Sequence, residues 1–413
     1  MTIKYPLQIS AFIYVYFLLS VVSANAYEFP PYEGLTLKID GKVTESYSNN
    51  LTFASDSEDR IEDYLTMLII GLDTKYEGRR NTFEVDGRLS RRIKTETSDI
   101  KNSSEYLALN FQNHISEYDR LNVRNVYTHS QLPGSFAEEF DMNNCRDELG
   151  KTGMSISDIY TECNRYKDEF GRVNAGFDTY KNSLYFVYNK SISEQFNFGT
   201  SYAYGQNWSN RQERQDSKSN YLKFNVNYLY SELTRFSLSY GHASTEYENG
   251  NVISTDTIDA GVNQYLTKRL NINGAVGLVF QPDTTNSSFS ASLNDEIDEK
   301  TFVTLSYSRS IDISTDTDNI FRNWQVTGQL NRQFLEDLGV VFSGFYGEGE
   351  YDPWGIRDRF VGASASINYD FWENKRGAKV SGTLGYTYSE LNSTDDSRDY
   401  DRTMVDSTLT ASF

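Results

Sequence analysis

Apolar and polar residues alternate in segment after segment of this chain, and this period of two constrains the fold more than any other feature. The clearest case is the stretch 270–280, LNINGAVGLVF, where Leu270 and Ile272 share one parity and Asn271 and Asn273 share the other. In a β-strand successive side chains point to opposite faces. The sequence therefore predicts strands with one apolar face and one polar face.

Eighteen segments with this pattern lie between residues 35 and 413, and two kinds of connection alternate between them. One kind is short, as in SEYD, SEQ and LTK; the other is longer and acidic, as in SDSEDR, ISTDTDNI and LNSTDDSRDYD. Short turns at one end, long loops at the other and an even number of strands are typical of outer-membrane barrels. A soluble propeller would also contain many strands, but no blade motif repeats. We therefore expect an all-β fold: a single transmembrane antiparallel up-and-down β-barrel of about eighteen strands, with short periplasmic turns and long extracellular loops.

The first 26 residues have the features of a secretory signal peptide. Lys4 supplies a positive charge, residues 11–22 are apolar apart from Ser20, and Ala24-Asn25-Ala26 forms a cleavage site. The apolar stretch is too short to span a bilayer as a helix. We expect residues 1–26 to be removed and residues 27–413 to form the barrel, without a separate soluble domain.

Composition agrees with a membrane barrel. The chain has 31 Tyr and 25 Phe but only 6 Pro, and aromatic residues form girdles at the two interfaces of such barrels. Outer-membrane lipid and lipopolysaccharide are then the expected surroundings. A net charge of −19 argues against a nucleic-acid partner, because phosphates require basic surface. No cofactor and no metal site are expected.

The last strand carries a more specific signal. In VDSTLTASF, Val405, Leu409, Ala411 and the terminal Phe413 share one parity. This end resembles the final strand of bacterial outer-membrane β-barrels of the porin type. The resemblance implies a location in the outer membrane of a Gram-negative cell. It also implies that the barrel-assembly machinery recognises Phe413 as an assembly signal.

A narrower resemblance covers residues 89–140, LSRRIKTETSDIKNSSEYLALNFQNHISEYDRLNVRNVYTHSQLPGSFAEEF. This segment resembles the first half of uncharacterised porin-type barrels, some of which are encoded with exopolysaccharide systems. The resemblance implies polysaccharide export components as partners, if the chain serves such a system.

The polar parity is expected to line the lumen. It is mostly neutral and hydrogen-bonding, for example at Lys223, Asn225, Asn271 and Asn273. One region is charged, and its channel-lining candidates are Glu84, Asp86, Arg88, Arg92 and Arg124. Two interpretations of these charges stay open. They focus a field across a constriction, as opposed charges do in porins, or they pair with one another and stiffen the wall.

The third long loop, about residues 130–170, contains Cys145 and Cys163, the two cysteines of the chain. In an exported protein we expect them to form a disulfide, which would stabilise the loop by about 3 kcal/mol; free thiols are the alternative. We expect the loop to fold into the lumen, and a flexible external loop is the other interpretation.

Enzyme motifs are missing. The three histidines form no H-E-x-x-H, and no G-x-S-x-G occurs. His242 and Ser244 share one face of a strand, opposite Asp256, and so resemble the His-x-Ser of outer-membrane phospholipase. The flanking serine motif of that family is absent, so we expect no enzyme and no catalytic residues.

The function that follows is passive passage of polar solutes, such as sugars, across the bacterial outer membrane. A barrel of eighteen strands is wide enough to leave an aqueous channel. Two alternatives stay open: an exopolysaccharide secretion barrel, and a non-conducting structural or adhesive surface barrel.

Overall fold

The computed structural model describes residues 34–50, 62–94, 103–130, 179–209, 216–281, 284–313, 320–352, 354–374 and 378–412. The expected signal peptide, the loop with Cys145 and Cys163, and the terminal Phe413 lie outside these residues. No helix in the described ranges is long and apolar enough to cross a membrane.

The described residues form an 18-stranded sheet with one short 3-10 turn, η1 (Asp396–Arg398). The strands are β1 (Leu35–Ser48), β2 (Asp63–Glu77), β3 (Asn81–Lys94), β4 (Ser103–His114), β5 (Asp119–Ser130), β6 (Thr179–Ser191), β7 (Phe196–Ser209), β8 (Ser217–Ser231), β9 (Thr234–Tyr247), β10 (Val252–Tyr265), β11 (Leu270–Phe280), β12 (Thr285–Asp298), β13 (Thr301–Ile313), β14 (Ile320–Gln333), β15 (Leu338–Asp352), β16 (Ile356–Glu373), β17 (Lys379–Ser393) and β18 (Tyr400–Ser412).

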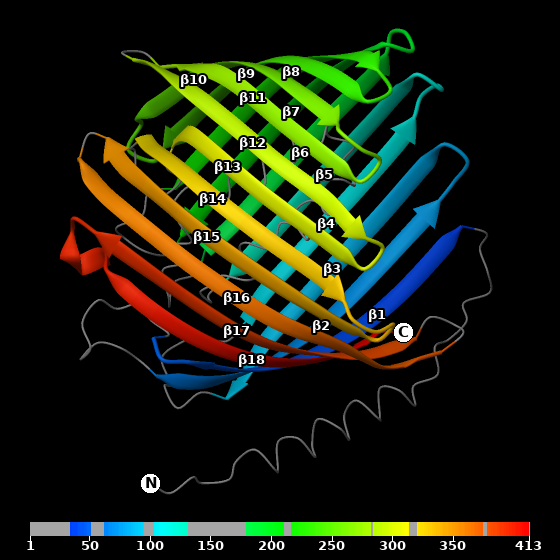
Figure 1. The fold of residues 1–413 in the computed structure, drawn as a ribbon, viewed down its shortest axis with the longest axis vertical. Coiled ribbons are helices and arrows are strands. Elements are labelled where there is room, and N and C mark those ends of the chain that lie inside the picture. The colour runs from blue at the N-terminus through cyan, green and yellow to red at the C-terminus, as the bar shows by residue number, and fades with distance from the viewer. Residues whose placement is uncertain are drawn as a thin grey trace, which may run out of the picture.

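The sheet closes on itself. Each strand pairs antiparallel with its neighbours in sequence, and β1 also pairs with β18, placing Val43 opposite Leu409. Figure 1 shows β10–β18 on the near wall of the barrel and β2–β8 on the far wall. Closure leaves no strand edge with unpaired backbone groups, which is the condition for a sheet in lipid. The prediction of an antiparallel up-and-down barrel of eighteen strands is confirmed.

The exterior carries the apolar parity. Leu89, Val276 and Leu305 are 63%, 57% and 51% exposed, far more than apolar residues in a soluble core. Aromatic side chains are exposed beside the short turns, as at Tyr230 and Phe371. An exposed apolar band with aromatic residues at its edge matches the surface that a barrel presents to a bilayer.

Strands continue into several stretches that the sequence indicates as loops. In GEYDPWGIRD, β15 runs to Asp352 and β16 begins at Ile356. There the exterior is charged: Arg359 Nε lies 2.9 Å from Glu348 Oε1. β16 has 18 residues, whereas about 9–11 cross a bilayer. The wall therefore extends past the apolar band on the long-loop side, where the exterior is polar and the sequence shows no apolar exterior parity.

A hydroxyl at the second turn position shapes several of the short turns. Ser193 Oγ accepts a hydrogen bond from the backbone N–H of Phe196 at 3.1 Å, and Thr267 Oγ1 accepts one from Leu270 at 2.9 Å. Ser and Thr side chains commonly stabilise tight turns in this way. The repeated I/L-S/T pattern of ISEY, ISEQ and LTKR therefore fixes where one strand ends and the next begins.

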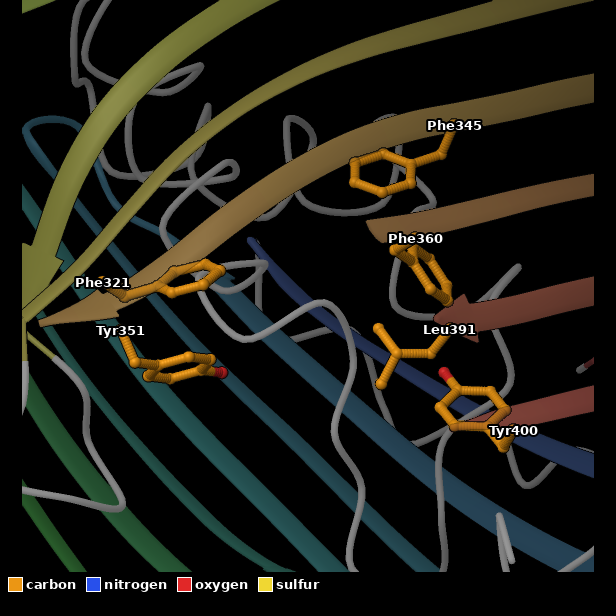
Figure 2. Close-up of a cluster of buried hydrophobic side chains, with 6 residues drawn as sticks. All are labelled: Phe321, Phe345, Tyr351, Phe360, Leu391 and Tyr400. Carbon is orange, nitrogen blue, oxygen red and sulfur yellow. The ribbon is translucent and has the colours of Figure 1, made fainter. Parts of the chain in front are cut away.

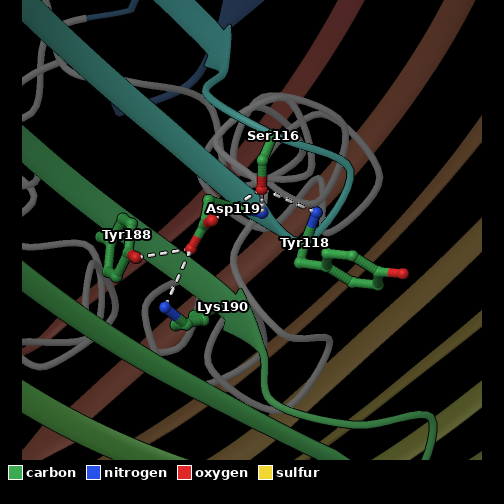
Figure 3. A network of polar contacts seen from close by, with 5 residues as sticks. All are labelled: Ser116, Tyr118, Asp119, Tyr188 and Lys190. Carbon is green, nitrogen blue, oxygen red and sulfur yellow. Dashed lines mark hydrogen bonds and ion pairs between the residues drawn. The ribbon is translucent and has the colours of Figure 1, made fainter.

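The turn between β4 and β5 extends this arrangement into a polar network (Figure 3). Ser116 Oγ donates to Asp119 Oδ2 at 2.6 Å and accepts from the Tyr118 N–H at 3.1 Å. The Tyr188 hydroxyl donates to Asp119 Oδ1 at 2.7 Å, and Lys190 Nζ lies 3.7 Å from the same oxygen. Asp119 thus ties the turn to the neighbouring strand β6.

Candidate functional site

The candidate site is the interior face of the barrel. On β11, Asn271 and Val279 are buried, whereas Ile272, Val276 and Leu278 are exposed. Because the exposed apolar parity faces outwards in a closed barrel, the alternate parity faces the interior. Interior side chains lie close to their cross-strand neighbours, and their chemistry differs from wall to wall.

A charged wall spans β1–β5. Lys75, Glu84, Asn110 and Arg124 lie side by side on β2, β3, β4 and β5. Lys75 Nζ is 3.6 Å from Glu84 Oε1, and Asn110 Nδ2 donates to Glu84 Oε2 at 3.1 Å. Arg124 is only 5% exposed. Within this row each ionised side chain therefore has a polar or oppositely charged neighbour.

Arg88 and Arg124 meet at Tyr106. Arg88 Nη2 lies 3.2 Å from Asp86 Oδ2, and its guanidinium lies over the Tyr106 ring, 5.8 Å from the ring centre. Arg124 Nη2 donates to the Tyr106 hydroxyl at 3.2 Å. These contacts favour the interpretation in which the charges pair with one another on one wall. Arg92 belongs to β3, but its side chain lies outside what the structure describes.

Two carboxylates of this wall were missed by the sequence analysis. Asp73 lies directly opposite Asp86, and Asp40 lies opposite Gly71, whose other neighbour is Arg88. The segment that became β2 is apolar on both parities, so its facing could not be read from the sequence. The available signal was Gly71 itself, because a glycine inside an apolar strand often marks a position where a neighbouring group needs the space.

The neutral residues predicted to line the lumen lie on β8 and β11. Asn273 Nδ2 donates to Asn271 Oδ1 at 2.8 Å and to Ser292 Oγ at 3.1 Å. Lys223 is 7% exposed on β8, and the Asn225 side chain occupies the space over a glycine of β7. The structure therefore brings Asn271 and Asn273 together, and it places Lys223 and Asn225 further around the same face.

A ladder of hydroxyl and amide groups continues this neutral wall across β12–β17. Its cross-strand hydrogen bonds join Thr304 to Asn294, Ser306 to Thr327, Ser310 to Asn323, Ser343 to Ser364, and Thr383 to Asn368. These residues belong to the polar parity that the sequence analysis assigned to the interior face. The pairing between strands explains why they are short side chains, since each must reach a partner on the adjacent strand.

Towards the long-loop end, the interior becomes apolar. Figure 2 shows six buried side chains from five consecutive strands, β14–β18: Phe321, Phe345, Tyr351, Phe360, Leu391 and Tyr400. The rings of Phe321 and Tyr351 are 4.6 Å apart, and those of Phe345 and Phe360 are 5.1 Å apart. The sequence analysis did not predict the cluster, because it expected polar side chains on the interior parity.

An ion pair adjoins this cluster. Arg398, in η1, contacts the Asp358 carboxylate through Nη2 and lies over the Tyr351 ring, 4.5 Å from its centre. The side chain of Asp358 is 0% exposed and that of Arg398 is 11% exposed. The connection between β17 and β18 is thus tied to the interior faces of β15 and β16.

His242 and Asp256 do meet, on the exterior. His242 Nδ1 is 2.9 Å from Asp256 Oδ1, and the Tyr240 hydroxyl donates to the same oxygen at 2.7 Å. Ser244 lies opposite Ser254. Asp256 is thus held by two partners in a surface cluster, and in the described residues no hydrogen bond joins Ser244 to His242.

The part of the chain that the structure describes contains no group of three or more His, Cys, Asp or Glu side chains able to hold a metal ion. The predicted disulfide of Cys145 with Cys163 and the assembly role of Phe413 concern residues beyond those described, and both stay predictions.

No family model matches the chain, and no curated protein matches it. Similar solved structures include OccK3 (OpdO) of Pseudomonas aeruginosa, with 12% identity, coverage of 91% of this chain and 95% of that chain, and a TM-score of 0.48. OccAB4 of Acinetobacter baumannii has 10% identity, coverage of 93% and 100%, and a TM-score of 0.47. The siderophore receptor PirA of A. baumannii has 8% identity, coverage of 92% and 81%, and a TM-score of 0.45. Identities and TM-scores this low carry no argument about this chain. The description of the fold therefore rests on the barrel itself.

Proposed function

We propose that this protein is an outer-membrane channel for passive passage of polar solutes. The observation that carries the proposal is the division of the closed barrel into an apolar exterior and a polar interior, with paired charges on β1–β5 and neutral hydrogen-bonding groups on β11–β17. A structural barrel needs no such interior, because burying polar groups in a packed core is unfavourable unless every one is paired.

The neutral wall favours uncharged, hydroxyl-bearing solutes such as sugars. Amide and hydroxyl groups both donate and accept hydrogen bonds, so they replace the water that a polyol loses on entry. The charged wall adds a field from one side. Glu84, Asp86, Arg88, Arg92 and Arg124, with Lys223, Asn225, Asn271 and Asn273, are the proposed channel-lining residues.

Reconstitution tests this function directly. The purified protein in a planar bilayer should give stepwise conductance in KCl, and in liposomes it should allow swelling in a small neutral sugar. A barrel closed by its own residues would give neither signal. Unfolded or aggregated protein is excluded by a parallel check of heat-modifiable gel mobility, which reports a folded barrel.

A further inference from the structure

A cavity of about 620 Å³ opens in the wall near the short-turn end of β12–β17. It is lined by Glu296, Asp298, Asn331, Gln333, Asn368 and Asp370, with other side chains around them. All six lie within a few residues of the turns that join β12 to β13, β14 to β15 and β16 to β17. The cavity is thus far from the aromatic cluster, at the opposite end of the strands.

Two irregularities of the sheet flank this cavity. The register of β12 against β13 shifts between Glu296 and Asp298, and that of β16 against β17 shifts between Asp370 and Trp372. A bulge inserts an extra residue into one strand, bends it and re-aims its side chains. Glu296 and Asp370, which line the cavity on opposite flanks, therefore lie where the regular pairing between strands is interrupted.

The floor of the cavity carries side-chain amide groups. Asn331 and Gln333 of β14 lie opposite Val341 and Gly339 of β15, and the Gln333 Oε1 atom lies 2.9 Å from where a Cβ on Gly339 would be. A side chain at position 339 would crowd Gln333, so the glycine leaves the amide room over the wall. Gln333 Nε2 donates to the Glu336 carbonyl at 2.9 Å, and Asn331 Oδ1 accepts from Gln329 Nε2 at 3.2 Å. The Gln333 Oε1 acceptor and the Asn331 Nδ2 donor are the amide groups proposed to bind hydroxyl groups of a polyol.

The cavity lining is acidic on balance: it contains five carboxylates, Glu296, Asp298, Glu299, Asp337 and Asp370, against three cations, Lys300, Arg332 and Lys379. Asp370 pairs with Lys379 at 2.7 Å, which neutralises one carboxylate. Asp298 accepts hydrogen bonds from the Lys300 N–H at 2.8 Å and from Thr301 Oγ1 at 3.1 Å, which leave its negative charge in place. Glu296 adds a further negative charge and is exposed. The local field disfavours an anion and favours a neutral or positively charged solute.

We infer that this cavity is a solute subsite at the periplasmic exit of the channel, and that it takes a small polyol or saccharide, neutral or carrying an amine. The inference rests on the proposed channel function and adds the class and position of the solute. The volume falls within the range of small-molecule sites. The excess of carboxylates disfavours carboxylated sugars, and the amide groups of the floor favour hydroxyl-bearing ones.

Three probes of one size separate charge from shape: glucosamine, glucose and gluconate. Each is added to the periplasmic side of a single channel in KCl, and the concentration that halves the open-channel current is measured. We expect glucosamine to block at the lowest concentration, glucose next and gluconate last. Equal block by all three, or strongest block by gluconate, would overturn the inference.

Variants locate the site. Glu296→Gln keeps the shape and removes one charge, so it should raise the blocking concentration of glucosamine about two- to fivefold and leave that of glucose unchanged. Asn331→Leu should weaken both. The matched control is Glu350→Gln, which removes a carboxylate from the exterior of β15. If Glu350→Gln changes glucosamine block as much as Glu296→Gln does, the effect is general and the subsite is refuted.

The two proposals fail in distinguishable ways. A protein that conducts KCl but does not discriminate among the probes is a channel without this subsite. A folded protein that never conducts contradicts the channel. In that case calorimetric titration of the detergent-solubilised protein with the same probes decides the subsite: heat of binding to glucosamine that Glu296→Gln reduces supports it, and its absence overturns it.

Discussion

The carboxylate of Asp40 lies over Gly71 and interacts electrostatically with Arg88, although β1 and β3 are not neighbours in the sheet. Asp40 is the cross-strand partner of Gly71 on one side, and Arg88 is its partner on the other. The Asp40 Oδ1 atom lies 2.1 Å from where a Cβ on Gly71 would be. The glycine thus opens a gap through which charges on β1 and β3 interact.

Gly71→Ala should therefore destabilise the barrel. The new methyl group would displace the Asp40 carboxylate, and overpacking of this kind costs about 1–3 kcal/mol. Gly41→Ala is the matched control, since nothing lies within 4 Å of a Cβ there. The midpoint of guanidinium unfolding in detergent is the measurement. Equal midpoints for the two variants would show that Asp40 moves aside freely.

The sequence was sufficient to predict the barrel because every strand repeats the same physical constraint. Lipid on one side and water on the other impose a period of two, as in Leu270 to Phe280. The signal fails where the wall leaves the membrane. Around Glu348 and Arg359 the exterior is charged instead of apolar, so the residues look like a loop although they pair as strands.

The interior was less predictable, for a reason that Phe360 and Asp358 illustrate. Parity assigns both to the interior of β16, but it gives no information on which neighbours they meet. Those neighbours, Tyr400 and Arg398, lie some forty residues away in the sequence. The charged wall shows the same limit. Arg88 was identified as an interior residue, yet its relation to Asp40 depends on the facing of β2.

Replacing Arg88 by glutamine should make the channel more selective for cations. The change removes a positive charge and leaves Asp86 without the ion pair at 3.2 Å. One charge acting over about 10 Å in water changes an ion's energy by about 0.4 kcal/mol, or about twofold in partitioning. The reversal potential in a KCl gradient measures this ratio. Arg357→Gln, on the exposed exterior, is the control and should leave the reversal potential unchanged.

Arg398 and Asp358 should contribute to the free energy of unfolding as a strongly coupled pair. Arg398→Met leaves the Asp358 carboxylate buried without this partner, and breaking a buried pair in this way costs about 3–5 kcal/mol. Asp358→Asn in the same chain should restore part of the loss, because the charge that needed compensation is gone. Unfolding of both single variants and the double variant gives the coupling energy. Strictly additive effects would show that the pair is not a unit.

Asp119 should make the short-turn end sensitive to acid. It adjoins the turn outside the membrane-spanning part of β5, and hydrogen bonds from Ser116 and then Tyr188 hold the pKa of this carboxyl below its ordinary value. A lowered folded pKa stabilises the protein above the unfolded pKa, and this contribution is lost as the pH falls through the folded pKa. Asp119→Asn should therefore lower the unfolding midpoint at pH 7, and the difference should fade below about pH 4. Glu117→Gln, in the same turn, is the control.

The last prediction concerns Cys145 and Cys163, which we expect to be joined in the exported protein. Their compartment is oxidising, and they are the two cysteines of the chain. A disulfide should leave both thiols unreactive towards an alkylating reagent until a reductant is added, and mass spectrometry of the digested protein should recover one linked peptide pair. If the bridge holds the loop within the lumen, reduction should change the single-channel conductance or its noise, and Cys145→Ser should reproduce the change without reductant. Conductance that is the same in oxidised protein, reduced protein and Cys145→Ser would show that the loop does not limit the pore, even if the disulfide forms.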